Sequence, residues 1–237
     1  MTKFTFLGTR GYIEEHNKRH KYHSSLLLSS RGTKVLIDYG LIRKKELNEI
    51  NPDAVLITHA HPDHYAWLKE KVETEIPVYL TETSLKKGKY KPNNYKLITP
   101  DKKFNIGKFK ILPYKIKHSL RAPALGFKVF LPEKKTVVYN PDVVKIMHPK
   151  KILKGVDYYI GDGACISVCL IRRKNDKVYG HARVPTQIRW CKDYGIDKII
   201  FTHLGKESLR REKEFSEKQP EVTFAYDGMT KRIISKG

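Results

Sequence analysis

Cysteine and long hydrophobic runs are both scarce in this sequence. Only three cysteines occur among 237 residues, which excludes a small secreted module held together by disulfide bonds. No apolar run approaches the roughly 20 residues of a membrane span, and residues 1–10 lack the apolar region of a secretory signal. No linker or repeat divides the chain. We therefore expect a cytoplasmic protein without a membrane partner, folded as a single domain over residues 1–237.

Acidic residues are too few to balance the basic ones. The chain has 47 Lys and Arg against 25 Asp and Glu, a formal net charge of +22. A surplus of this size concerns association rather than fold, and it indicates a polyanionic partner such as a nucleic acid. A Lys-rich thermophilic proteome is the other explanation, but there Glu rises together with Lys. In this chain Asp and Glu are not enriched together with Lys.

Short runs rich in Val, Ile, Leu, Tyr and Phe, bounded by Gly, Pro, Asn or Asp, predict many strands. Helices are expected between them, at residues 64–72, 185–194 and 206–218. Strands with interspersed helices predict a layered α/β domain with the helices outside. The expected strands are 3–7, 24–29, 34–37, 54–58, 77–80, 108–116, 126–131, 136–139, 157–160, 198–202 and 222–225.

Four potential metal ligands follow one short apolar strand. The sequence Leu-Ile-Thr-His-Ala-His-Pro-Asp-His occupies positions 56–64 and places His59, His61, Asp63 and His64 within six residues. Neutral imidazoles and ionised carboxylates are the usual zinc ligands. So many ligands at one strand end are directed at a common point, and the segment predicts a metal site rather than a chance surface cluster.

Three further polar residues end apolar strands later in the chain. His118 follows Tyr-Lys-Ile-Lys, Asp142 follows Val-Val-Tyr-Asn-Pro, and His203 follows Ile-Ile-Phe-Thr. Each of them alone could be an ordinary core or loop residue. Together with the first cluster they form a set that can complete a metal centre.

In this order, these residues resemble the motifs of the metallo-β-lactamase superfamily over nearly the whole chain. Asp38, after a strand, matches the first motif, and His-x-His-x-Asp-His matches the second. The resemblance implies a four-layer αββα sandwich with a two-metal site at one edge. It implies one metal on His59, His61 and His118, a second on Asp63, His64 and His203, Asp142 bridging them, and Asp38 orienting the ligands.

The same resemblance restricts the type of reaction that we expect. His61 stands where redox-active diiron members carry an acid, which favours hydrolysis. Asp142 follows His118 by only 24 positions, too few for the RNA-gripping arm of RNase Z enzymes. Asp162 and His181 resemble the auxiliary acid and His of those enzymes, which handle protons near the leaving group, although each could instead be a turn or loop residue. The chain is most similar to the compact phosphodiesterase-like branch.

Two divalent ions, Zn²⁺ or alternatively Mn²⁺, are the expected cofactors. Ions about 3.5–4 Å apart lower the pKa of a bridging water towards ~7, and that hydroxide would attack phosphorus while the ions take up charge on the phosphoryl oxygens. The candidate catalytic residues are Asp63, Asp162 and His181, with His181 protonating the departing oxygen. We expect a phosphodiesterase that acts on nucleic acid. The alternatives are a small-molecule hydrolase of the same fold, for a cyclic phosphodiester, thioester or lactone, and a non-catalytic nucleic-acid-binding module.

Several basic segments are candidates for gripping the substrate. Residues 9–23 alternate basic and aromatic side chains, the mixture that holds phosphates and stacks bases. Lys86–Lys91, Lys108, Lys110 and Arg172–Lys174 add positive charge, although each could be a solvated face. The three cysteines, Cys165, Cys169 and Cys191, are expected to be small buried hydrophobic residues.

Overall fold

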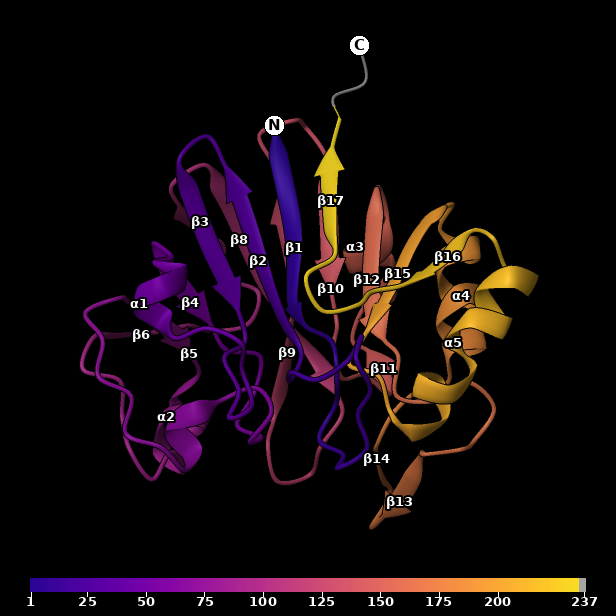
Figure 1. Cartoon of the computed structure of the whole chain (residues 1–237), viewed down its shortest axis with the longest axis horizontal. Coiled ribbons are helices and arrows are strands. Elements are labelled where there is room, and N and C mark those ends of the chain that lie inside the picture. Colours follow the sequence, from indigo (N-terminus) through magenta and orange to yellow (C-terminus); the bar gives the residue numbers. More distant parts are fainter. Residues whose placement is uncertain (235–237) are drawn as a thin grey trace.

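Two β-sheets packed face to face form the centre of the molecule in the computed structural model, which describes residues 1–234 (Figure 1). The first sheet has the strand order β17-β1-β2-β3-β4-β5-β6. Its strands are β1 (Thr2–Gly8), β2 (Ser25–Ser30), β3 (Thr33–Ile37), β4 (Ala54–Leu56), β5 (Val78–Leu80), β6 (Tyr95–Leu97) and β17 (Thr230–Ile233).

The second sheet has the order β11-β8-β9-β10-β12-β15-β16, with β7 paired to β8. Its strands are β7 (Phe104–Ile106), β8 (Phe109–Lys117), β9 (Ala124–Phe130), β10 (Thr136–Tyr139), β11 (Lys145–Ile146), β12 (Tyr158–Asp162), β15 (Lys198–Thr202) and β16 (Val222–Phe224). The strands β10, β12 and β15 run parallel to one another. Their carboxyl ends therefore lie at the same edge of the sheet.

Side chains from the inner faces of the two sheets form the main core. In β1 and β2 buried residues alternate with less buried ones, as expected for strands that present one face to a core. Phe4 and Leu28 of the first sheet meet Phe127 and Ile160 of the second in one buried cluster. This packing of sheet on sheet holds the two halves of the chain together.

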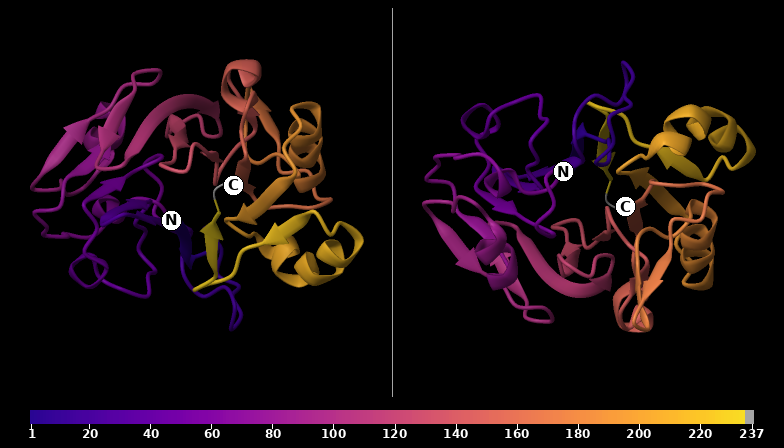
Figure 2. Two further views of the ribbon diagram at one scale, coloured as in Figure 1. Left: turned by 90° about the horizontal axis from the view of Figure 1, so that it is seen from above. Right: turned by 90° about the horizontal axis from the view of Figure 1, so that it is seen from below.

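Helices cover the two outer faces. The first sheet carries α1 (Leu47–Ile50), the 3₁₀ turn η1 (Ala66–Leu68) and α2 (Glu82–Lys87). The second carries α3 (Pro149–Leu153), α4 (Val184–Asp193) and α5 (Lys206–Lys218). Figure 2 shows α4 and α5, in orange and yellow, on one side of the molecule. The expected four-layer αββα sandwich is confirmed.

The helix expected at residues 64–72 is wrong, since only the single turn η1 forms there. The backbone of this segment is bound elsewhere: Tyr39 donates its N–H to the carbonyl of His64 and accepts the N–H of Ala66. These bonds hold residues 64–66 extended against the end of β3 and prevent a regular helix. The burial expected for all three cysteines is also wrong for Cys169, which is exposed, while Cys165 and Cys191 are buried.

One hairpin lies outside both sheets. The strands β13 (Arg172–Lys174) and β14 (Lys177–Tyr179) pair only with each other among the described residues. The hairpin projects from the body of the molecule next to the ends of the parallel strands (Figure 1). Within residues 1–234, no helix is both long and apolar enough to cross a bilayer.

Candidate active site

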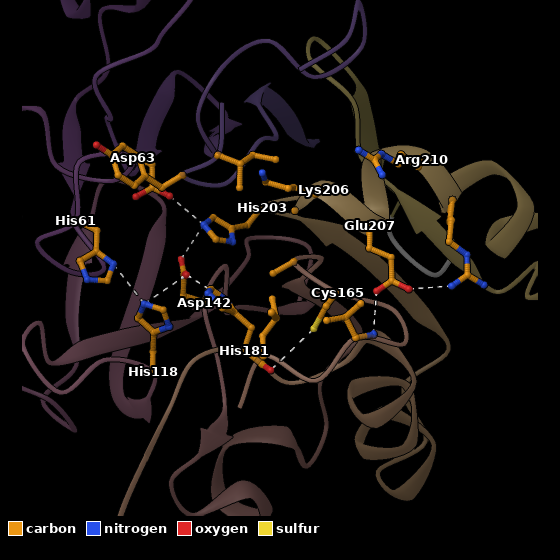
Figure 3. Close-up of a pocket in the computed structure, with 17 residues that line it drawn as sticks. His61, Asp63, His118, Asp142, Cys165, His181, His203, Lys206, Glu207 and Arg210 are labelled. Atoms are coloured by element: carbon orange, nitrogen blue, oxygen red, sulfur yellow. Dashed lines mark hydrogen bonds and ion pairs between the residues drawn. The ribbon is translucent and has the colours of Figure 1, made fainter. Parts of the chain in front are cut away.

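The candidate site residues gather where strands of both sheets end. Asp38 follows β3, and His59 lies just beyond β4, in the first sheet. In the second sheet His118 follows β8, Asp142 lies beyond β10, and His203 follows β15. Because carboxyl ends of neighbouring parallel strands meet at one edge, side chains placed just after them converge (Figure 3).

Three imidazoles form one group. His59, His61 and His118 each place a nitrogen within 4.8 Å of the other two. The Nε2 atom of His59 lies 2.9 Å from Nδ1 of His61, and Nε2 of His118 lies 3.3 Å from the same atom. Nitrogen atoms that converge in this way can hold one cation.

Asp63, His64 and His203 form a second group with the same spacing of at most 4.8 Å. Oδ2 of Asp63 is 2.9 Å from Nε2 of His203 and 3.2 Å from Nε2 of His64. Asp142 lies between the groups, with Oδ2 2.7 Å from His64 Nε2 and Oδ1 3.5 Å from His118 Nε2. The structure therefore brings together all seven residues that the sequence suggests as ligands.

Unsatisfied polar atoms at this centre fit bound cations. The buried atoms His64 Nε2 and Asp142 Oδ2 lack a hydrogen bond of normal geometry, and so does Asp63 Oδ1. An unpaired buried polar group costs about 1–3 kcal/mol, and such groups are rare in folded proteins. Three of them in one place, all on His and Asp, match the donors that zinc and similar ions prefer.

The protonation of the centre also fits a metal. Burial lowers the pKa of His61 to about 4 and lowers the pKa of His59 well below its usual value, so both imidazoles are neutral and keep a free lone pair. Burial opposes charge on Asp142 as well, but the surrounding histidines hold its pKa well below the usual value. Burial lowers and the neighbouring carboxylates raise the pKa of His203, with a net rise to about 10. A bound cation would replace that positive charge.

Asp38 supports the centre from behind and is fully buried. Nδ1 of His64 lies 2.8 Å from Oδ2 of Asp38, while Thr58 donates its N–H and its hydroxyl to Oδ1 at 2.8 and 2.9 Å. This contact orients the ring so that Nε2 of His64 faces Asp142, as the partner of a ligating imidazole does. Thr58 is a contributor that the sequence did not indicate.

Strained backbone turns two of these side chains into the site. Asp38 has φ 65° and His203 has φ 56°, both in the left-handed region. Such a conformation costs a non-glycine residue on the order of 1 kcal/mol. Each residue directly follows a strand, so the left-handed backbone changes the direction of the chain where the ligand groups lie.

Asp162 and His181 lie beside the ligand groups and contact each other. Oδ2 of Asp162, the last residue of β12, is 2.8 Å from Nδ1 of His181. The carboxylate also accepts the backbone N–H groups of Val143 and Ala164, each at 2.9 Å. His181 makes no hydrogen bond through Nε2 within residues 1–234, and it lines the same cavity as the ligands. The pair can present an oriented imidazole to a substrate.

A cavity of about 760 Å³ opens over these residues (Figure 3). A space of this size holds a small ligand or one part of a larger one. The seven candidate metal ligands are here called the ligand centre, and five of them form the base of the cavity with His181: His61, Asp63, His118, Asp142 and His203. The walls come from residues 12–13, from residues 164–170 and from the first turns of α5. The wall residues are Tyr12, Ile13, Ala164, Cys165, Val168, Leu170, Gly205, Lys206, Glu207, Arg210 and Arg211.

The cations on α5 are functional candidates that the sequence analysis missed. Lys206 and Arg210 are four residues apart and therefore share one face of the helix. The ammonium of Lys206 pairs with Glu15 at 2.6 Å, whereas Arg210 has no ion pair among the described residues. Their position in the sequence could have revealed them, because α5 begins only three residues after the candidate ligand His203.

The structure places the basic segments that were expected to bind the substrate in different environments. In the loop at 9–23, Arg10, His20 and His23 are buried, so these side chains are structural and cannot hold a phosphate. The guanidinium of Arg10 donates to the carbonyls of Ile13 and Glu14. Of the further basic segments, the one at 172–174 reaches a cavity at the site, through Arg172.

A protein-family comparison decides the assignment. Residues 19–160 match the family described as "Beta-lactamase superfamily domain". The chain belongs to the metallo-β-lactamase superfamily. It is a hydrolase of that fold, and the fold implies divalent metals. The His and Asp groups described above are the residues of this chain that could bind them.

Relatives across the superfamily agree with this assignment. The chain is 24% identical to a ribonuclease Z of Methanopyrus kandleri over 96% of each chain. A metallo-β-lactamase fold protein of Bacillus subtilis, YhfI, superimposes with a TM-score of 0.73 at 20% identity, covering 97% of this chain and 98% of the other. A diphosphatase of the PhnP family gives a TM-score of 0.73 at 14% identity, covering 99% of each. The structural likenesses concern the fold.

Proposed function

We propose that this superfamily member is a two-metal phosphodiesterase that cleaves nucleic acid. The observation that carries the proposal is the convergence of two ligand groups and the Asp162–His181 pair on one cavity. Cationic side chains on α5 line the same cavity and suit a substrate that carries phosphates. The identity to a ribonuclease Z and the net charge of +22 support a polynucleotide over other phosphodiesters.

His59, His61 and His118 would hold one ion, and Asp63, His64 and His203 the other, with Asp142 shared between them. Zn²⁺ suits this His and carboxylate donor set, and Mn²⁺ is the alternative. When bound, such a pair supplies a nucleophilic hydroxide at neutral pH and neutralises charge on the phosphoryl oxygens. The chain itself contributes the orientation of the ligands, through the contact of Asp38 with His64.

His181 would donate a proton to the departing oxygen of the substrate. Its Nδ1 is held by Asp162 at 2.8 Å, and its Nε2 remains available on the cavity side. Lys206 and Arg210 would bind phosphoryl oxygens outside the reacting group. These roles assign binding, orientation and proton transfer to separate elements of the chain.

The second candidate is a hydrolase of a small phosphodiester. Apolar side chains, among them Ile13, Val168 and Leu170, form much of the cavity wall. A partly apolar cavity of about 760 Å³ is typical of small-molecule sites. The fold shared with a diphosphatase agrees with this candidate.

The test is metal-supplemented cleavage of labelled single-stranded DNA, single-stranded RNA and bis-p-nitrophenyl phosphate in parallel. A chelator control and the variant His61→Ala accompany each substrate, and His16→Ala, which removes an exposed His outside the site, is the matched control. We expect metal-dependent cutting of a polynucleotide that is lost in His61→Ala and kept in His16→Ala. Turnover of the small diester alone would favour the second candidate, and full activity of His61→Ala would overturn both.

A further inference from the structure

The hairpin formed by residues 172–179, here called the basic hairpin, concentrates positive charge on one face. Two of its three cross-strand pairs are Arg172 with Tyr179 and Lys174 with Lys177, while Arg173 pairs with Val178. Because residues two apart in a strand and residues paired across strands point to the same side, the four side chains of the first two pairs share one face. Asp176, in the turn, is the only acid of the hairpin.

The charges on this face are unbalanced within the protein. Arg172, Lys174 and Lys177 are exposed, and none of them forms an ion pair with a carboxylate within residues 1–234. Lys174 and Lys177 are directly opposite each other across the two strands. Like charges in that position destabilise a hairpin. A short hairpin that keeps such a pair has a face suited to an anionic partner.

The same face begins at the candidate active site. Arg172 and Tyr179 line a second cavity, of about 330 Å³, together with His61, His118 and His181. Lys174 and Lys177 lie one step further out along the strands. The positive face thus runs from the ligand centre to the tip of the hairpin, with one aromatic ring at its inner end.

Residues 166–171 and Gly180 lead into and out of the basic hairpin and are here called its neck. Hydrogen bonds hold the neck on both sides. On the first limb, the carboxylate of Glu207 accepts the backbone N–H groups of Ile166, Ser167 and Val168 at 2.9–3.1 Å. On the second limb, Gly180 donates its N–H to the carbonyl of His118 at 2.7 Å. These bonds fix where the hairpin leaves the body of the molecule.

Gly180 allows the two limbs to meet. It has φ +109°, and a Cβ atom there would lie 1.9 Å from the carbonyl oxygen of Leu170. No other residue fits this contact without moving the backbone. The direction of the hairpin relative to the ligand centre is therefore set by this backbone contact together with the hydrogen bonds to Glu207.

We propose that the basic hairpin is a docking arm for single-stranded nucleic acid, which it guides across the ligand centre. Arg172, Lys174 and Lys177 bind successive backbone phosphates, and Tyr179 offers its ring to a base next to the centre. This inference rests on the proposed phosphodiesterase function, and it adds the surface that selects a polynucleotide over a small diester.

The test compares two charge-neutralised variants of the metal-loaded protein. The hairpin variant is Arg172→Gln with Lys174→Gln and Lys177→Gln. The matched control is Lys3→Gln with Lys108→Gln and Lys110→Gln, three exposed cations without an ion pair in the described chain. Lys108 and Lys110 flank the start of β8, the strand that leads to His118 at its other end. Fluorescence anisotropy measures the Kd for a labelled single-stranded oligonucleotide at several salt concentrations.

We expect the hairpin variant to bind at least about tenfold more weakly at low salt, with a salt slope of log Kd reduced by about 2, as for three lost phosphate contacts. The control should keep nearly the full slope, and a charge-retaining variant, Lys174→Arg with Lys177→Arg, should bind like the wild type. Thermal melting and metal content establish that each variant is folded and loaded.

Equal weakening of the hairpin variant and the control would overturn the proposal, because charge would then act without regard to position. Absence of binding by the wild type would overturn it as well. If the wild type binds the oligonucleotide through the hairpin but cuts no polynucleotide, the docking arm stands while the proposed nuclease activity fails. The anisotropy is measured with His181→Ala added to every protein compared, since cleavage is then expected to be slow. Binding is thus read separately from cleavage, and the two ideas are tested independently.

Discussion

The buried side chain of Asp162 fixes both the backbone around it and the ring of His181. Its carboxylate accepts two backbone N–H groups and contacts His181, while its own backbone is bonded to the side chain of Gln187. Burial opposes charge on Asp162, but the contacts with His181 lower its pKa. An ionised carboxylate at this position fixes which nitrogen of His181 faces the cavity.

The proton role of His181 predicts a dependence on the leaving group. For His181→Ala we expect kcat on a nucleic-acid substrate to fall by roughly 10²–10⁴. The loss on bis-p-nitrophenyl phosphate should be far smaller, because p-nitrophenolate departs without a proton. Steady-state kinetics on both substrates give the ratio. An equal loss on the two substrates would contradict proton donation and would indicate that His181 serves the metal centre, which its proximity to Asp142 also permits.

At the scale of elements, most strands are predictable from the sequence, and the exceptions are short. All the expected strands occur, with ends displaced by no more than two residues. Among strands of two or three residues, β4 and β5 are recognisable as continuous apolar runs, whereas β6, β7 and β11 contain Lys or Asn and show no apolar pattern. The helix expected at 64–72 fails for a tertiary reason, since Tyr39 takes the backbone bonds that a helix would need.

Glu207 of α5 accepts hydrogen bonds from the neck of the basic hairpin. The pH dependence of stability should therefore report on this contact. Burial raises the pKa of Glu207, but hydrogen bonds from the Ser167 hydroxyl and from three backbone N–H groups lower it to about 2. The group is thus ionised in the folded protein well below the usual 4.5. Its contribution to stability is fully present above pH ~4.5 and is lost as the pH falls towards 2.

This linkage predicts the behaviour of Glu207→Gln. At pH 7 the variant should have a lower free energy of unfolding by on the order of 2 kcal/mol. The difference from the wild type should shrink as the pH falls from about 4.5 towards 2, because the wild-type carboxylate then becomes protonated. Urea unfolding at a series of pH values measures it. Glu217→Gln, at an exposed position of the same helix without an ion pair among residues 1–234, should show neither effect. A pH-independent difference for Glu207→Gln would contradict the linkage.

At the scale of the whole molecule, the ligand centre joins the two sheets. His59, His61 and His64 come from segments that follow the first sheet, and His118, Asp142 and His203 come from the second. A sequence reveals such residues because chemistry-bearing side chains stand out at the ends of apolar strands. It does not reveal Thr58, Glu207 or Arg210, because their roles depend on which distant segments the fold brings beside them.

Because bound ions would hold both sheets at once, their removal should lower stability. At a free metal concentration 100 times Kd, binding to the folded state contributes about 2.7 kcal/mol. For a chain of this size that corresponds to a fall in Tm of about 5–10 °C on chelation. Differential scanning calorimetry with zinc and with chelator measures it. His61→Ala, which removes one ligand of the first ion and leaves the second group intact, should show a smaller difference between the two conditions than the wild type. An unchanged wild-type Tm would contradict a metal centre between the sheets.

The close contact between Leu170 and Gly180 has a consequence for which changes in sequence and length the hairpin segment can tolerate. Since backbone atoms form this contact, the segment between these positions can be shortened, lengthened or exchanged while the reactive groups stay in place. Insertions elsewhere at the site would displace a ligand or one of its supports. If the basic hairpin binds the substrate as proposed, recognition and chemistry lie in separable segments of this chain. A different segment grafted between residues 170 and 180 would then direct the same ligand centre to another substrate.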